Sequence, residues 1–189
     1  MKRLFFFMVL AGCIAVSNAQ TAKEMYEAQN RKIQNTFFGN QFGDSFFKVK
    51  SKLYSEFGEY NVFTSEKRKE INLYNSTFGG SEWHFITFSF DNTRKFYMIH
   101  FSQEYGRKED AKNRYTVLKE LLEVKYGNGA DLTTNSLYST KCWCDNTCCA
   151  VLSLTYGQSN GGDYYWYCTL DYYDDKAFTS ETKSIIEEL

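Results

Sequence analysis

The residues best suited to chemistry in this chain are its cysteines, because four of them fall within eight positions. The run KCWCDNTCC spans residues 141–149, and Cys168 follows later in the chain. Clustered cysteines in an exported protein usually form disulfides. If DNT is the turn of a hairpin, side-chain alternation along the paired strands places three cysteines on one face: Cys142, Cys144 and Cys148.

Cys168 alternates with Trp166 and Leu170 and is therefore expected to face the core. The disulfide candidates are Cys142, Cys144, Cys148 and Cys168, which would form two bridges. Cys149 points the other way and is the candidate for an unpaired thiol. We expect no metal site, because C-x-C-x₃-C-C is not a pair of C-x₂-C knuckles and lacks a nearby histidine. We also expect no thiol-redox function, because C-x-x-C is absent.

Other catalytic signals are sparse. The chain has only two histidines, His84 and His100, and lacks a phosphate-binding glycine motif, G-x-S-x-G and H-E-x-x-H. We therefore expect a protein that is not an enzyme and binds no cofactor. The alternative is a hydrolase that uses carboxylates such as Asp171 and Asp174, or a histidine. The two histidines fall on predicted neighbouring strands, which brings them within range of each other.

A tyrosine-rich strand near the C-terminus is the candidate binding surface. Its core face is assigned to Tyr164, Trp166, Cys168, Leu170 and Tyr172. The opposite face, which should be polar in a sheet that is solvated on one side, consists of Tyr165, Tyr167, Thr169, Asp171 and Tyr173. Tyrosine combines a rigid apolar ring with a polar tip, which suits binding. The alternative is that a helix, the N-terminal segment or a dimer partner covers this face.

The elements that would position these residues follow a faint repeat of about 69 residues, the spacing of Gly58 and Gly127. Helices are predicted at 44–57 and 109–126, each ending at one of these glycines. Three strands follow each helix, at 69–77, 82–90, 95–103, 137–144, 149–157 and 163–173. Further helices are predicted at 21–36 and 179–188.

Helical periodicity supports these assignments. Asp44 is a suitable N-cap for the helix at 44–57. In the helix at 109–126, an apolar stripe is formed by Ala111, Tyr115, Leu118 and Leu122, widened by Val117, Leu121 and Val124. The predicted fold class is α+β: two α-βββ repeats, about 38–105 and 106–189, that form one antiparallel sheet with helices packed on one face.

This pattern carries a family resemblance in architecture and short motifs. Phe42-Gly43-Asp44-Ser45 opens a helix that closes on Phe57-Gly58, as in small exported bacterial α+β modules. The tandem arrangement is similar in outline to β-lactamase-inhibitor-type proteins, which bind other proteins without catalysis. The usual repeat of that family has two helices and four strands, more than are counted here. No functional residue is carried over from the resemblance.

The N-terminus has the pattern of an export signal. Lys2 and Arg3 precede an apolar run, and Ser17-Asn18-Ala19 provides the small residues that a signal peptidase requires, so residues 1–19 are assigned to a signal peptide and 20–189 to a single domain. Leu10-Ala11-Gly12-Cys13 resembles a lipobox, so the open alternative is an outer-membrane lipoprotein anchored through Cys13. The run is too short for a transmembrane span.

The function expected from these features is a non-enzymatic binding or interaction module of the bacterial envelope, in the periplasm or secreted. Its ligand would be a protein or peptide first and a carbohydrate second. The net charge of -1 provides no field to attract nucleic acid. The remaining alternative is a purely structural role, with dimerisation through the tyrosine face.

Overall fold

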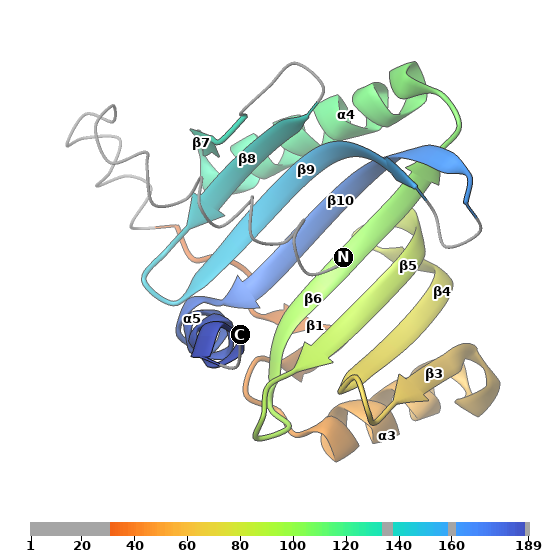
Figure 1. Cartoon of the computed structure of the whole chain (residues 1–189), viewed down its shortest axis with the longest axis vertical. Coiled ribbons are helices and arrows are strands. Elements are labelled where there is room, and N and C mark those ends of the chain that lie inside the picture. The colour runs from red at the N-terminus through yellow and green to blue at the C-terminus, as the bar shows by residue number, and fades with distance from the viewer. Residues whose placement is uncertain (1–30, 134–137, 159–161, 188–189) are drawn as a thin grey trace.

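A computed structural model of the chain describes residues 31–133, 138–158 and 162–187 (Figure 1). The predicted signal peptide, Cys13 and residues 21–30 of the first predicted helix lie outside this part of the chain. Residues 31–35 are not helical, and Thr36 already belongs to a strand, so the prediction of a helix to residue 36 is wrong.

The fold is α+β, as predicted, and is built on one antiparallel sheet of eight strands in the order β3-β4-β5-β6-β10-β9-β8-β7. The strands of the first half are β3 (Val62–Ser65), β4 (Glu70–Phe78), β5 (Ser81–Phe90) and β6 (Phe96–Tyr105). Those of the second half are β7 (Ala130–Asp131), β8 (Ser139–Cys144), β9 (Cys148–Gln158) and β10 (Tyr164–Asp174). The predicted strands are thus present, and the short edge strands β3 and β7 are additional.

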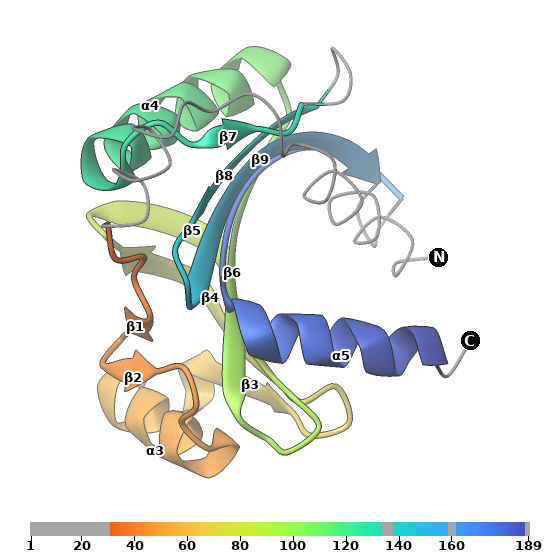
Figure 2. The same ribbon diagram turned by 90° about the vertical axis from the view of Figure 1, so that its left-hand side faces the viewer.

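The helices lie on both faces of this sheet. The helices are α3 (Phe46–Phe57), α4 (Lys108–Tyr126) and α5 (Asp175–Glu187), with a short 3-10 turn η1 (Glu59–Asn61) after α3. Figure 2 shows a bent sheet with α3 and α4 on its outer side and α5 on the inside of the bend. The prediction of helices on one face therefore fits α3 and α4 but not α5.

The main core lies between the outer face of the sheet and the helices α3 and α4. It includes Val49 and Leu53 of α3, Leu118 and Leu122 of α4, and large aromatic side chains of the sheet. Phe37, in the two-stranded sheet of β1 (Thr36–Phe37) and β2 (Asn40–Gln41), is completely buried and packs 4.9 Å from the ring of Tyr172. These aromatic contacts account for much of the unusual aromatic content of the chain.

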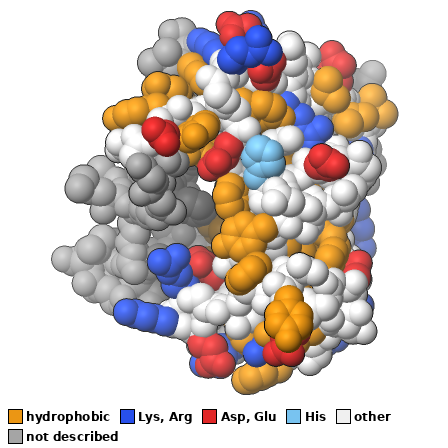
Figure 3. Space-filling model, turned by 90° about the vertical axis from the view of Figure 1, so that its right-hand side faces the viewer, with side chains coloured by type: hydrophobic (Ala, Val, Ile, Leu, Met, Phe, Trp, Pro, Cys, Tyr) orange, Lys and Arg blue, Asp and Glu red, His pale blue; other side chains and the backbone are white. Residues whose placement is uncertain are grey.

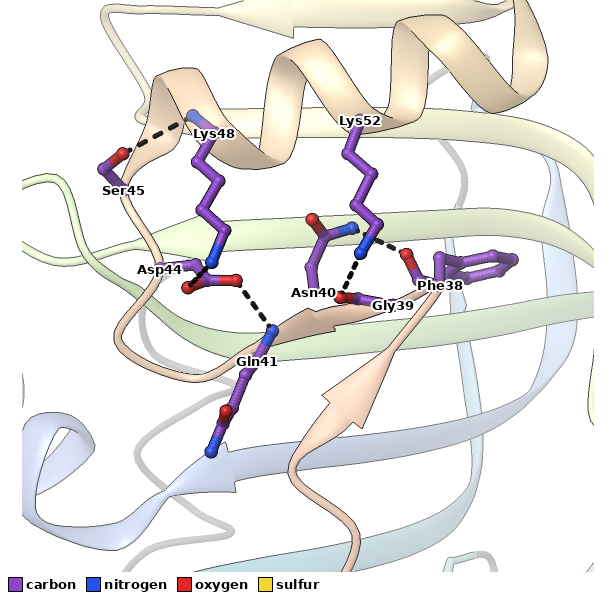
Figure 4. Close-up of polar contacts among 8 residues, drawn as sticks. All are labelled: Phe38, Gly39, Asn40, Gln41, Asp44, Ser45, Lys48 and Lys52. Carbon is purple, nitrogen blue, oxygen red and sulfur yellow. Dashed lines mark hydrogen bonds and ion pairs between the residues drawn. The ribbon is translucent and has the colours of Figure 1, made fainter.

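The start of α3 is held by side-chain contacts that differ from the expected cap. Ser45, rather than Asp44, is the N-cap, and its Oγ accepts a hydrogen bond from the backbone N–H of Lys48. Asp44 instead accepts from the backbone of Gln41 and pairs with the ammonium of Lys48 at 2.7 Å (Figure 4). Lys52 donates to the carbonyl of Gly39, so α3 is tied to the β1–β2 hairpin.

The outward face of α4 is more apolar than expected for a surface. Ala111, Leu118 and Leu122 are buried as predicted, whereas Val117, Leu121 and Val124 are 50%, 56% and 84% exposed. The buried apolar stripe of this helix is therefore narrower than predicted, because the three residues that were expected to widen it are exposed. The sheet contacts only a narrow strip of the helix, so residues one position away from the buried strip already face solvent.

The last helix begins directly after the last strand, four residues earlier than predicted. Asp174 ends β10, and its carboxylate accepts a 2.9 Å hydrogen bond from the backbone N–H of Ala177 in the first turn of α5. This carboxylate is thus used to cap a helix, as acidic side chains commonly are.

Candidate functional site

The candidate site lies on the inner face of the sheet, where β6 and β10 pair at its centre. Residues that are paired across these two strands point to the same face. The pairs on the inner face are His100 with Asp171, Ser102 with Thr169, and Glu104 with Tyr167. Each of the five predicted binding residues of β10 faces inward and is half-buried. On the opposite side of β10, Cys168, Leu170 and Tyr172 are buried as predicted, but the assignment of Tyr164 to the core is wrong, because Tyr164 at the end of the strand is 58% exposed.

An imidazole–carboxylate pair occupies the centre of this inner face. Nδ1 of His100 lies 2.6 Å from Oδ1 of Asp171, and their side chains are 33% and 18% exposed. A hydrogen bond at Nδ1 fixes the orientation of the ring and leaves Nε2 as the nitrogen available to other groups. The two residues come from different halves of the chain, 71 positions apart.

The electrostatics of the pair favour the protonated histidine. Burial disfavours the charge, but the charge of Asp171, its hydrogen bond and the charge of Glu70 together outweigh burial and raise the pKa of His100. A half-buried ion pair at the middle of a sheet face can therefore present a positive imidazole edge beside a carboxylate.

The tyrosines beside this pair have different environments. Burial and the neighbouring Glu104, which also accepts a hydrogen bond from the phenol, raise the pKa of Tyr167. Tyr173 packs against another element of the chain, because the ring of Phe178 in α5 stacks on it with 4.4 Å between ring centroids. Tyr165 lies opposite Gly157 of β9, where the partner strand presents no side chain. Tyr165 and Tyr167 are thus the predicted tyrosines most accessible to a ligand.

The polar character of the inner face extends to the strands on either side. Thr87, the partner of His100 on β5, donates a 2.7 Å hydrogen bond to Asn72 of β4. On the other side, the hydroxyls of Thr140 and Ser153 lie 3.3 Å apart. A row of hydroxyl and amide groups therefore crosses the sheet next to the ion pair.

An aromatic row continues the inner face toward the β3 edge. Phe63 and Tyr74 contact each other at 4.9 Å, and Tyr74 contacts Phe85 at 5.4 Å, all between ring centroids. Phe63 is 51% exposed and Tyr74 45%. Sequence reasoning missed this row because β3 was not predicted. Its three members lie on three different strands, so alternation within one strand does not reveal the row.

Hydrophobic side chains are also grouped on the side of the molecule that is on the right in Figure 1. Figure 3 shows hydrophobic side chains gathered in clusters on one side of the molecule, next to acidic and basic side chains. Exposed apolar groups that are rimmed by polar groups are common at binding surfaces.

The second histidine does not join the pair. His84 lies on β5, next to the strand of His100, but His100 is paired with Thr87, three residues further along β5. Nδ1 of His84 accepts a 3.1 Å hydrogen bond from the backbone N–H of Glu104. The two histidines do lie on adjacent strands, as predicted. The register of these strands nevertheless places them at different positions along the strand direction, so they do not face each other.

The cysteines form a single disulfide within the described residues, between Cys144 and Cys149. The expected two bridges are therefore wrong, and so is the assignment of Cys149 as the unpaired thiol. Asp145 pairs with Cys148 across a two-residue loop, whereas a three-residue turn was expected. The register of the hairpin is therefore shifted by one residue, so that Cys149 rather than Cys148 lies opposite Cys144 and shares its face. Cys148 and Cys168 are buried thiols on the core side.

Three sulfurs remain close together on the inner face, where no metal site was expected. The Sγ atoms of Cys142, Cys144 and Cys149 all lie within 4.8 Å of one another. Thiolates at such spacing can hold a metal ion. In the structure two of them share the disulfide, so the cluster has the chemistry of a disulfide beside a thiol.

Comparison with known proteins adds no functional assignment, because no family model, curated protein or solved structure matches the chain. Among the described helices, none combines the length and apolar character that a membrane span requires.

Proposed function

We propose that this chain is a non-enzymatic binding module and that the inner face of its sheet holds the ligand. The observation that carries the proposal is the composition of this face, where half-buried tyrosines and a partly exposed aromatic row flank a polar centre. A structural role for the face would leave it completely covered, whereas Tyr165, Tyr167 and Thr169 all keep exposed surface.

The ligand that this face suits best is a peptide or a segment of a protein. Phe63, Tyr74 and Phe85 offer ring surface to apolar side chains, while the hydroxyl row and the His100–Asp171 pair offer donors and acceptors to a polar backbone. A carbohydrate, which would combine ring stacking with the same hydroxyl contacts, is the second candidate. In keeping with the N-terminal pattern, the proposed place of action is outside the cytoplasm, in the bacterial envelope.

The proposal is tested by selecting ligands on the immobilised protein from a library of random displayed peptides, followed by an array of oligosaccharides. Tyr167→Ala should weaken binding of a selected peptide about tenfold, the loss of one aromatic contact. Tyr164→Ala is the matched control, because Tyr164 lies on the same strand, faces outward and is 58% exposed. Equal effects of the two substitutions, or no selected ligand, would contradict the proposal.

We further propose that the two halves descend from one repeated unit of a helix followed by four strands. The strand orders β3-β4-β5-β6 and β10-β9-β8-β7 mirror each other around the central β6–β10 pair. Both α3 and α4 end at a glycine of positive φ, Gly58 and Gly127, whose N–H bonds to the carbonyl four residues earlier. If the proposal is correct, superposing the two halves through these elements will align α3 with α4.

A hydrolase remains the second candidate function because of one contact, the 2.6 Å approach of Asp171 to His100. A carboxylate at Nδ1 allows Nε2 to act as a general base toward water. The test is hydrolysis of a panel of p-nitrophenyl esters and glycosides by the wild type, His100→Gln and, as matched control, His84→Gln. Loss of turnover with His100→Gln alone would support a hydrolase, and equal rates in all three proteins would exclude this role for His100.

A further inference from the structure

A thiol lies in contact with the disulfide at the β8–β9 hairpin. The Sγ of Cys142 is 3.3 Å from the Sγ of Cys144, which is bonded to Cys149. Cys142 and Cys144 are two residues apart on β8 and therefore share a face, while Cys149 is the cross-strand partner of Cys144. The attacking, attacked and leaving sulfurs of a thiol–disulfide exchange thus lie within 4.8 Å of one another, and a rotation of the Cys142 side chain is needed to bring its sulfur into line with the Cys144–Cys149 bond.

We propose that Cys142 exchanges with this disulfide, so that the folded chain has two disulfide connectivities. Cys142 gives up its proton, and its thiolate attacks the Sγ of Cys144. The Cys142–Cys144 bond forms as the Cys144–Cys149 bond breaks, and the electron pair leaves on the sulfur of Cys149, which takes up a proton. The number of disulfides and thiols is unchanged, so the step requires neither an oxidant nor a reductant.

Backbone spacing allows both connectivities. The cross-strand pair Cys144 and Cys149 has its Cα atoms 4.1 Å apart. Two residues of one strand are about 6.6 Å apart at a rise of about 3.3 Å per residue, which is near the upper limit of about 6.8 Å for disulfides. Both spacings lie near the ends of the usual range of about 4.4–6.8 Å, so both bonds are attainable, and the Cys144–Cys149 bond is the one present in the structure.

The surroundings direct the exchange to these three cysteines. Cys142 is 7% exposed and packs with Leu132 and Val151, which holds its side chain beside the disulfide. Cys148 and Cys168 face the core on the other side of the sheet. Burial also raises the pKa of the Cys168 thiol to about 12, which keeps it protonated and unreactive at neutral pH.

The exchange would change what ties the hairpin together. The Cys144–Cys149 bond joins β8 to β9, whereas the Cys142–Cys144 bond lies within β8 and frees the sulfur of Cys149 beside Tyr173, its cross-strand neighbour on β10. This disulfide exchange does not depend on the ligand proposed for the inner face.

The experiment traps the Cys149 thiol as it appears. The purified chain is incubated with iodoacetamide at about pH 8.5, where thiolates form, and in parallel at about pH 5. It is then digested after Lys141 and before Asp145, which separates residues 142–144 from residues 145–162. A Cys144–Cys149 disulfide keeps these fragments linked, and a Cys142–Cys144 disulfide leaves them separate with Cys149 alkylated.

We expect Cys149 to be alkylated at least about tenfold faster in the wild type than in Cys142→Ser, and only at the higher pH. Cys148→Ser is the matched control and should behave as the wild type does. Should Cys142→Ser fail to fold, Cys149→Ser treated with glutathione disulfide as the oxidant offers a second readout, with separate fragments and a Cys142–Cys144 bond. Equal alkylation of Cys149 in wild type and Cys142→Ser, alkylation of Cys142 alone, or two thiols in Cys149→Ser after treatment with glutathione disulfide would overturn the proposal.

Discussion

Asp171 and His100 face each other across the two central strands of the sheet, with 2.6 Å between Oδ1 and Nδ1. One residue belongs to the last strand of each half of the chain, so this contact exists only because β6 pairs with β10. The joint between the halves therefore carries a charged pair on the inner face of the sheet.

The His100–Asp171 pair should make stability depend on pH. The pKa of folded His100 is raised, so the stabilisation is fully present below the unfolded pKa of about 6.5 and is lost as the pH rises through the folded pKa. His100→Asn should therefore reduce the free energy of unfolding by about 1 kcal/mol more at about pH 5.5 than at about pH 9.

Urea titrations of the wild type and the variant at the two pH values measure this difference. His84→Asn is the control, because Nδ1 of His84 accepts from a backbone N–H rather than facing a carboxylate. An equal loss for His100→Asn at both pH values would show that the pair does not hold the histidine in its charged form.

Adjacent leucines of α4 should differ sharply in their contribution to stability. Leu122→Ala removes a side chain that is 5% exposed in the main core and should cost about 2–5 kcal/mol. Leu121→Ala changes a side chain that is 56% exposed and should stay within about 0.5 kcal/mol of the wild type. Denaturant unfolding of both variants provides the comparison, and similar costs would mean that a partner covers the outward face of α4.

Asp145 should stabilise the N-terminal end of the described chain as well as its own turn. Its Oδ1 accepts from the backbone of Thr147 and Cys148, and its Oδ2 accepts a 2.6 Å hydrogen bond from the backbone of Ile33, 112 residues away. Asp91 makes a similar turn with Thr93 and Lys95. Asp145→Ala should therefore cost about 1.5–3 kcal/mol more than Asp91→Ala, the contribution of one hydrogen bond to a charged group.

Hydrogen exchange provides the local measurement, since the Ile33 amide should lose protection in Asp145→Ala and keep it in Asp91→Ala. Burial opposes the Asp145 charge, but the hydrogen bonds from Cys148, Ile33 and Thr147 outweigh it and lower the pKa of Asp145. This stabilisation is present above the unfolded pKa of about 3.9 and is lost as the pH falls through the folded pKa. Unchanged Ile33 protection in Asp145→Ala would contradict the assigned contact.

Gly129 should not tolerate a side chain, because the chain passes directly over Trp143. A Cβ at Gly129 would lie 2.6 Å from the indole ring of Trp143 and 2.7 Å from the carbonyl of Cys142. Gly129→Ala should cost about 1–3 kcal/mol, as overpacked sites do. Gly106→Ala is the matched control, since nothing lies within 4 Å of its Cβ. Thermal unfolding of the two variants tests the difference, and equal midpoints would rule out this close approach.

Much of the secondary structure could be predicted from local patterns. The alternation of residues 82–90 and the glycines that end the helices at 44–57 and 109–126 placed β5, α3 and α4 within about two residues, the usual uncertainty of such boundaries. The short strands β3 and β7 were missed because they have four and two residues, too few for a period to be visible. The start of α5 was placed late because the strand pattern of β10 continues up to its cap.

The candidate site was only half visible in the sequence. Alternation along β10 placed Tyr165, Tyr167 and Asp171 on one face, which is a property of a single strand. The cysteine pairing failed because it depends on the hairpin register, and a shift of one residue moves every side chain to the other face.

The sequence by itself determined the helices α3 and α4, the long strands and the face of β10 on which the tyrosines lie, because these depend on residues that are neighbours in the chain. The tertiary structure alone decided that β10 pairs with β6, that Asp171 therefore meets His100, and that α5 returns to the inner face to cover Tyr173. Such contacts join residues that are far apart in the chain, and local periodicity contains no information about which distant strand will become the partner.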